Sequence, residues 1–195
     1  MTKQQRVPQT QEIDQQVAVP GAAAALQMPD ASSTAAVVLA QAMDYCARKM
    51  RLSGPSSAVQ AIKQGKPYAR NYCNYSVAKQ VAEALGHLDD NVKAVYVCEL
   101  DATPEDVCFG EGVQGSPIHM IIWSTRKTSA LQALVSGLDR ALSEQYSSLL
   151  GDTVRVHLLD AQVVDDADVQ ARLGYGALIA SIHNPPLRVW HRDED

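Results

Sequence analysis

The feature that most constrains the fold is a long amphipathic helix set between two segments typical of β-strands. Apolar residues recur at helical spacing after Thr128 and Ser129, and Gly151 can end the helix. The segment before it, residues 115–124, reads GSPIHMIIWS, and the segment after it, residues 154–164, reads VRVHLLDAQVV. We therefore predict two strands of one sheet with a helix between them, and expect the strand that follows Ser116 to lie inside the sheet. The apolar face of the helix comprises Leu131, Leu134, Val135, Leu138, Leu142, Leu149 and Leu150.

The segments before this unit supply two helices and a strand. A helix is predicted over residues 32–51, capped by one of its first two serines. A second helix is predicted over residues 76–88, with Asn74 or Ser76 as its cap. Residues 92–100, VKAVYVCEL, are rich in β-branched side chains and predict a strand.

The C-terminal part predicts one interrupted helix and a short strand. Asp165 can cap a helix over residues 167–182, which Gly174 and Gly176 bend or interrupt. Residues 187–190, LRVW, predict a last strand. The fold class is therefore α/β, or α+β, with a small mixed sheet of three to four strands flanked by helices.

The chain is divided by composition into four parts. Residues 1–31 are rich in Gln, Ala and Pro and predict a flexible tail, and residues 32–68 predict a helical N-terminal extension. Residues 69–190 predict the α/β core domain, and residues 191–195 a solvated tail. Apolar residues make up 46% of the chain and aromatic residues only 5%, so the core is expected to consist of small and aliphatic side chains.

Charge and hydropathy limit the classes of partner. The net charge of −5 disfavours nucleic acid, which is held through clustered Lys and Arg. No apolar run approaches the roughly 18 residues of a membrane span, and the N-terminus lacks the apolar segment of a secretory signal. We therefore expect a soluble, cytoplasmic protein. The four cysteines form no CxxC pair, so no metal and no cofactor is expected, and the pairing of Cys98 with Cys108 stays open.

Over residues 76–190, the predicted order of elements resembles that of the polymerase-beta-like nucleotidyltransferase superfamily. This order is helix, strand, long loop, strand, long helix, strand, helix and short strand. In that superfamily a GS motif holds the nucleotide phosphates, and two carboxylates at the head of the next strand hold Mg²⁺. Here Ser116 fits the pattern, whereas Pro117 and His119 stand at the acidic positions, and the preceding strand ends in Cys98 and Glu99 without a GS pair. The resemblance implies the fold, and the missing carboxylates imply that metal-dependent transfer is lost.

The leading hypothesis is a non-catalytic nucleotidyltransferase-like module that binds a partner protein or a small anionic ligand. The question of enzymatic activity stays open, and no catalytic residue is assigned. Arg126 and Lys127 precede a helix N-terminus, where an anion is favoured. The candidate binding residues are these two and three residues from the two strands compared above, which gives the set Glu99, Ser116, His119, Arg126 and Lys127.

Two alternatives remain. One is an enzyme with an acid/base or metal site around Glu99, His119 and the acidic loop of residues 101–111, a loop that can equally be solvated. The other is a structural or assembly protein that forms a homo-oligomer through the helix of residues 32–51. His157 shares a strand with Arg155 and can belong to a polar patch beside the strand of His119.

Overall fold

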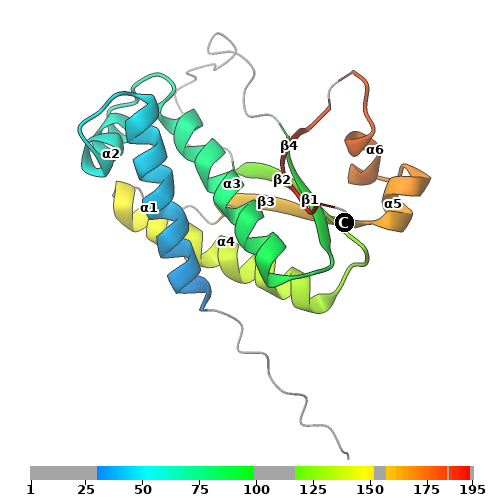
Figure 1. The fold of residues 1–195 in the computed structure, drawn as a ribbon. Coiled ribbons are helices and arrows are strands. Elements are labelled where there is room, and N and C mark those ends of the chain that lie inside the picture. Colours follow the sequence, from blue (N-terminus) through cyan, green and yellow to red (C-terminus); the bar gives the residue numbers. More distant parts are fainter. Residues whose placement is uncertain (1–29, 99–116, 152–156, 184, 194–195) are drawn as a thin grey trace, which may run out of the picture.

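A computed structural model describes residues 30–98, 117–151, 157–183 and 185–193. Within these residues, six helices flank one mixed sheet of four strands, which confirms the predicted α/β class (Figure 1). None of the helices in these ranges is both long and apolar enough to cross a membrane. The elements are α1 (Ala31–Lys49), α2 (Pro55–Lys63), α3 (Ala69–Leu88), β1 (Val92–Cys98), β2 (Ile118–Ser124), α4 (Ser129–Leu150), β3 (Leu159–Asp165), α5 (Asp166–Ala171), α6 (Tyr175–Ile179) and β4 (Leu187–His191).

The strands lie in the order β3-β2-β1-β4. β1 is antiparallel to both β2 and β4, whereas β2 and β3 are parallel and are joined through α4. A parallel pair needs a crossover connection of this kind, and α4 supplies it. β2 is therefore an interior strand, as the sequence predicted.

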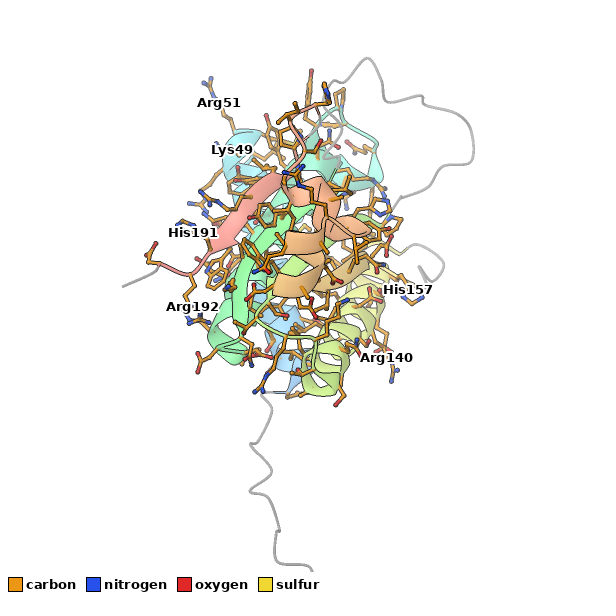
Figure 2. The ribbon with its side chains drawn as sticks, turned by 90° about the vertical axis from the view of Figure 1, so that its right-hand side faces the viewer. Lys49, Arg51, Arg140, His157, His191 and Arg192 are labelled. Atoms are coloured by element: carbon orange, nitrogen blue, oxygen red, sulfur yellow. The ribbon has the colours of Figure 1, made fainter. Side chains whose placement is uncertain are left out.

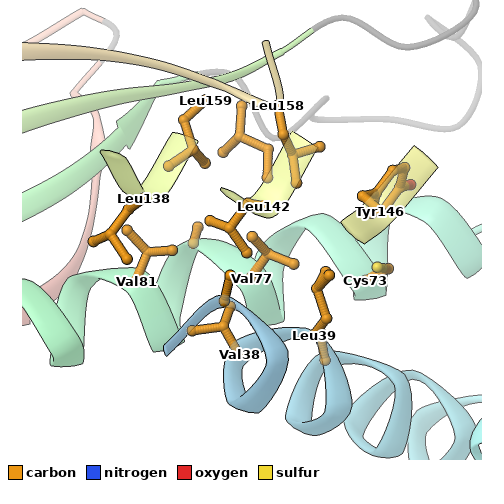
Figure 3. Packing of buried hydrophobic residues seen from close by; sticks show 14 of the residues in the cluster. Val38, Leu39, Cys73, Val77, Val81, Leu138, Leu142, Tyr146, Leu158 and Leu159 are labelled. Atoms are coloured by element: carbon orange, nitrogen blue, oxygen red, sulfur yellow. The ribbon is translucent and has the colours of Figure 1, made fainter. Parts of the chain in front are cut away.

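One face of the sheet is covered by α3 and α4, and α1 packs on these two helices from the side away from the sheet (Figures 1 and 3). The apolar face of α4 packs here through Leu138 and Leu142, opposite Val77 and Val81 of α3. Since side chains alternate along a strand, this layer receives every second residue of the strands. The strand residues in this core are Val92, Val95, Val97, Ile118, Met120, Ile122 and Leu159, with Ala161 and Val163 packed against it.

The opposite face has a thinner cover. Tyr96, Ile121 and Val164 form a small apolar cluster there, against which Val169 of α5 and Ile179 of α6 pack. These two helices span only six and five residues, so they cannot cover the whole face (Figure 1).

Several element boundaries differ from the predicted ones. α1 begins at Ala31, because the carboxylate of Asp30 accepts the Ser32 N–H at 3.1 Å and so provides the cap. α3 begins at Ala69 and runs through both predicted caps; Ala69 packs into the core and its carbonyl accepts the Cys46 thiol.

The C-terminal half also shows a difference from the predicted boundaries. β3 begins at Leu159. Before it, His157 and the Leu158 N–H bond to the Asp139 carboxylate of α4, and of these two residues only Leu158 also bonds to the sheet, through its carbonyl, which accepts the Ile118 N–H at 2.8 Å. The predicted interruption near Gly174 is confirmed, since it separates α5 from α6, and Asp165 caps α5 as predicted.

Candidate functional site

Three chemically reactive side chains form one row across the sheet. Cys98 of β1 is the cross-strand partner of His119 in β2, and His119 is in turn the partner of Asp160 in β3. Direct partners on neighbouring strands project from the same face, and Cys98 packs on the cluster beside α5 and α6. A thiol, an imidazole and a carboxylate are therefore adjacent on the thinly covered face.

The imidazole in this row is oriented by its carboxylate. His119 Nδ1 lies 2.8 Å from Asp160 Oδ2, and Asp160 Oδ1 accepts a hydrogen bond of 3.0 Å from Gln162 Nε2. Because an ionised carboxylate can only accept, this geometry assigns the Nδ1 proton to His119 and leaves Nε2 available for another group. The side chains of His119 and Asp160 are 44% and 38% exposed, so this pair is accessible to a ligand.

A second carboxylate–imidazole pair lies where the chain enters β3. Asp139 of α4 is buried; its Oδ2 is 2.6 Å from His157 Nδ1, and its Oδ1 accepts the N–H groups of Leu158 and Leu159 at 2.9 and 2.8 Å. Both backbone donors are buried; the Leu158 N–H also donates to Ser143 Oγ at 2.7 Å, whereas the Leu159 N–H would lack a partner without this carboxylate. Its role is to hold the start of β3 against α4.

A cavity of about 590 Å³ opens beside this second pair. Arg140 and His157 lie at the same edge of the molecule (Figure 2), and both line the cavity together with Asp139 and Asp160. Two carboxylates and two basic side chains thus share its wall. This balance of charge indicates no preference for an anion, and the cavity is therefore a weaker candidate site than the row across the sheet.

The far end of β2 carries a network of ion pairs. Lys93 Nζ lies 2.9 Å from Asp166 Oδ1, which also accepts the Trp123 indole N–H at 2.8 Å. The hydrogen bond from Lys93 is the main reason that the pKa of Asp166 is lowered. Lys127 pairs with Asp168 at 2.6 Å, and this bond raises the pKa of Lys127. These contacts connect α5 to β1 and to the segment after β2.

The candidate binding residues that the sequence predicted and the structure describes do not form a single site. His119 lies near the start of β2, whereas Arg126 and Lys127 follow its last residue, Ser124, which is about 17 Å from His119 at 3.3 Å per residue. Arg126 is exposed, and Lys127 is engaged with Asp168. Glu99 and Ser116 lie outside the described residues, as does the acidic loop of residues 101–111.

Sequence reasoning did not find the partners of His119. Asp160 is 41 residues away along the chain, and Cys98 belongs to the preceding strand. Only the strand order and register bring the three together. Within the described ranges, no group of three or more His, Cys, Asp or Glu side chains could hold a metal ion.

Exposed apolar side chains lie in and around α6, the helix that packs on the thinly covered face through Ile179. Ile182 is 86% exposed and Leu173 is 60% exposed. Tyr175 and Leu178 are exposed as well; Leu187 is also exposed, but as the cross-strand partner of the core residue Val97 it projects from the opposite face of the sheet. We call residues 172–188 the docking segment; its sequence contains two Arg and one His and no Asp or Glu.

No protein-family model, curated protein or solved structure matches the chain. The function is therefore inferred from the geometry of the described residues. Two features of the thinly covered face stand out: the row of Cys98, His119 and Asp160, and the docking segment.

Proposed function

We propose that the protein is a binding module whose docking segment, residues 172–188, receives an acidic, apolar segment of a partner protein. The observation that carries this proposal is the exposure of large apolar side chains within one short part of the chain. Contiguous exposed apolar surface is uncommon on monomeric proteins and is typical of protein-binding sites.

The local structure explains why these side chains are exposed. α6 spans only five residues and directs Ile179 toward the sheet, while Leu178 beside it stays exposed. The described residues that follow α6, 180–183 and 185–186, are not helical, and Ile182 is one of them. A helix this short can bury few of its residues, so its apolar neighbours remain available to a partner.

The charge of the docking segment indicates the chemistry of the partner. The whole chain has a net charge of −5, yet this segment has only basic charged residues, with Arg172, His183 and Arg188 exposed. Complementary charge steers association and disfavours partners of like charge. A segment of a partner protein that combines apolar and acidic residues fits both properties.

Other functions expected from the sequence have less support. The apolar face of α1 is already buried against α3 and α4, and Val37 is its exposed large apolar residue, so less of α1 is available for dimerisation. The nucleotidyltransferase resemblance and the binding of a small anionic ligand stay predictions.

Fluorescence polarisation with a labelled model peptide tests the proposal. The peptide is helical, with leucine at core spacing and glutamate elsewhere, and its control carries lysine in place of glutamate. We expect the acidic peptide to bind more tightly than the basic one, and added salt to weaken its binding. The double variant Leu178→Ser, Ile182→Ser should lower the affinity about tenfold or more.

Val37→Ser is the matched control, because Val37 is an exposed valine on α1, far along the chain from the docking segment. It should bind the acidic peptide like the unaltered protein. Equal affinity for the two peptides, or a double variant that binds as well as the Val37 control, would contradict the proposal. A dimer that the double variant dissociates would show that a second copy of the chain occupies the segment instead.

A further inference from the structure

We propose that Cys98, His119 and Asp160 form a nucleophilic site that accepts acyl groups from small thioesters or activated esters. This activity is independent of the docking segment, since none of the three residues belongs to it. Cys98 is the nucleophile, His119 the general base and acid, and Asp160 the residue that positions His119.

The strand register carries this proposal. Direct partners on adjacent antiparallel strands have Cβ atoms about 4.5–5.5 Å apart, within reach of an imidazole and a thiol. Cys98 and His119 are such partners, and both lie on the face of α5 and α6. With Nδ1 of His119 bonded to Asp160 on one side, Nε2 is the ring nitrogen left for the thiol on the other side.

The position of the row in the sheet leaves it open to a substrate. Ile121 and Val164, further along the strands, lie under Val169 and Ile179 of the two short helices. The side chains of His119 and Asp160, at the other end of β2 and β3, remain partly exposed. A small acyl donor can therefore reach the row without displacing part of the core.

The cysteines of the core provide an internal contrast. Cys46 and Cys73 are fully buried, and burial raises the pKa of the Cys46 thiol, which donates to the Ala69 carbonyl. A thiol attacks as its thiolate, so such buried groups are unreactive. Cys98 is half-buried and has an imidazole as its neighbour on the next strand, and an imidazole activates a thiol when the two come within hydrogen-bond reach.

The reaction would proceed in two balanced steps. His119 Nε2 takes the proton of the Cys98 thiol, the thiolate forms a bond to the carbonyl carbon, and the bond from this carbon to the leaving group breaks as His119 returns the proton to that group. Water then loses a proton to His119, attacks the same carbon and breaks the S–C bond, which regenerates the thiol and releases the acid. Asp160 keeps its charge and stabilises the imidazolium of both steps.

The test is acylation of the full chain by p-nitrophenyl acetate. We expect a burst of p-nitrophenol and an acetyl group on Cys98, located by peptide mass spectrometry. Cys98→Ala should abolish the burst, and His119→Gln should slow acylation by about 10²-fold or more. Cys108→Ser, which alters a different cysteine of the chain, should react like the unaltered protein.

Testing the role of Asp160 requires a variant that slows acylation without disturbing the fold. Asp160→Asn keeps the shape of the side chain, so it should leave the far-ultraviolet circular dichroism unchanged while it slows acylation and alters its pH profile. Asp160→Glu should restore part of the rate.

Three results would overturn the proposal: acetylation spread evenly over the cysteines, acetylation of Cys98 at an unchanged rate in the folded His119→Gln variant, or no acetylation of Cys98 at all. In the last case, peptide binding by the docking segment would still be measured separately, so the two proposals can fail independently.

Discussion

The buried carboxylate of Asp139 allows the effect of one side chain on stability to be calculated from its contacts. Asp139→Ala removes the acceptor of two buried backbone donors, the N–H groups of Leu158 and Leu159. The Leu158 N–H keeps a second acceptor, Ser143 Oγ at 2.7 Å, whereas the Leu159 N–H loses its acceptor at 2.8 Å. Leaving the buried Leu159 N–H without an acceptor costs about 1–3 kcal/mol, and the loss of one of the two acceptors of the Leu158 N–H costs about 1 kcal/mol.

We therefore expect Asp139→Ala to lower the free energy of unfolding by about 2–4 kcal/mol. His157 adds little to this value because its side chain is 67% exposed. Asp139→Asn keeps one acceptor oxygen and should cost less, about 1–2 kcal/mol. Urea unfolding, followed by circular dichroism and tryptophan fluorescence, measures both changes.

Asp44→Ala is the control for this series, because the Asp44–Arg48 pair on α1 has side chains 53% and 71% exposed. It should change stability by at most about 0.5 kcal/mol. If Asp139→Ala were as stable as this control, with an unchanged dependence on urea, the Asp139 carboxylate would not hold β3 and the reasoning would be refuted.

Two further variants test other contacts. Gly86→Ala would place a Cβ in a clash with the ring of Trp190, so the ring must move, and the free energy of unfolding should fall by about 1–3 kcal/mol in the same urea titration; unchanged stability would argue against this close packing. Lys93→Met removes the main cause of the lowered pKa of Asp166. The lowered pKa stabilises the folded protein above the ordinary pKa of an Asp side chain, and this stabilisation is lost as the pH falls through the pKa that Asp166 has in the folded protein. On acidification from about pH 5 to pH 2, Lys93→Met should therefore lose less stability than the unaltered protein. Arg48→Met is the control; if both variants lost the same amount of stability over this range, the role of Lys93 would be contradicted.

The fold was largely predictable because its longest elements have clear periods. Leu131, Leu138 and Leu142 lie on one face of α4 and are all buried, as helical spacing requires. The start of α3 was not predictable, since Asn74 and Ser76 favour caps by their own chemistry. Packing of Ala69 and Cys73 into the core overrides this preference and extends the helix toward its N-terminus.

The candidate site was predictable only in part. His119 is conspicuous in the sequence as a polar residue at the start of an apolar strand. Its neighbours depend on which strands pair and in which register, and no local signal contains that information. Asp160 occurs within an apolar segment that predicts a strand, but only the parallel pairing of β2 and β3 places it beside His119. The same limit applies to Lys127, whose partner Asp168 belongs to α5.

The two faces of the sheet explain why both proposals concern the same side of the molecule. α3 and α4 are 20 and 22 residues long and bury their face of the sheet in the main core, and α1, 19 residues long, packs on them from the other side. A polar side chain on that face would need a buried partner, so the face is restricted to packing. The opposite face has only α5 and α6 as cover, and there polar groups such as His119 and Asp160 can pair with each other while remaining in contact with solvent. Binding and chemistry can therefore evolve on this face at little cost to the stability of the core.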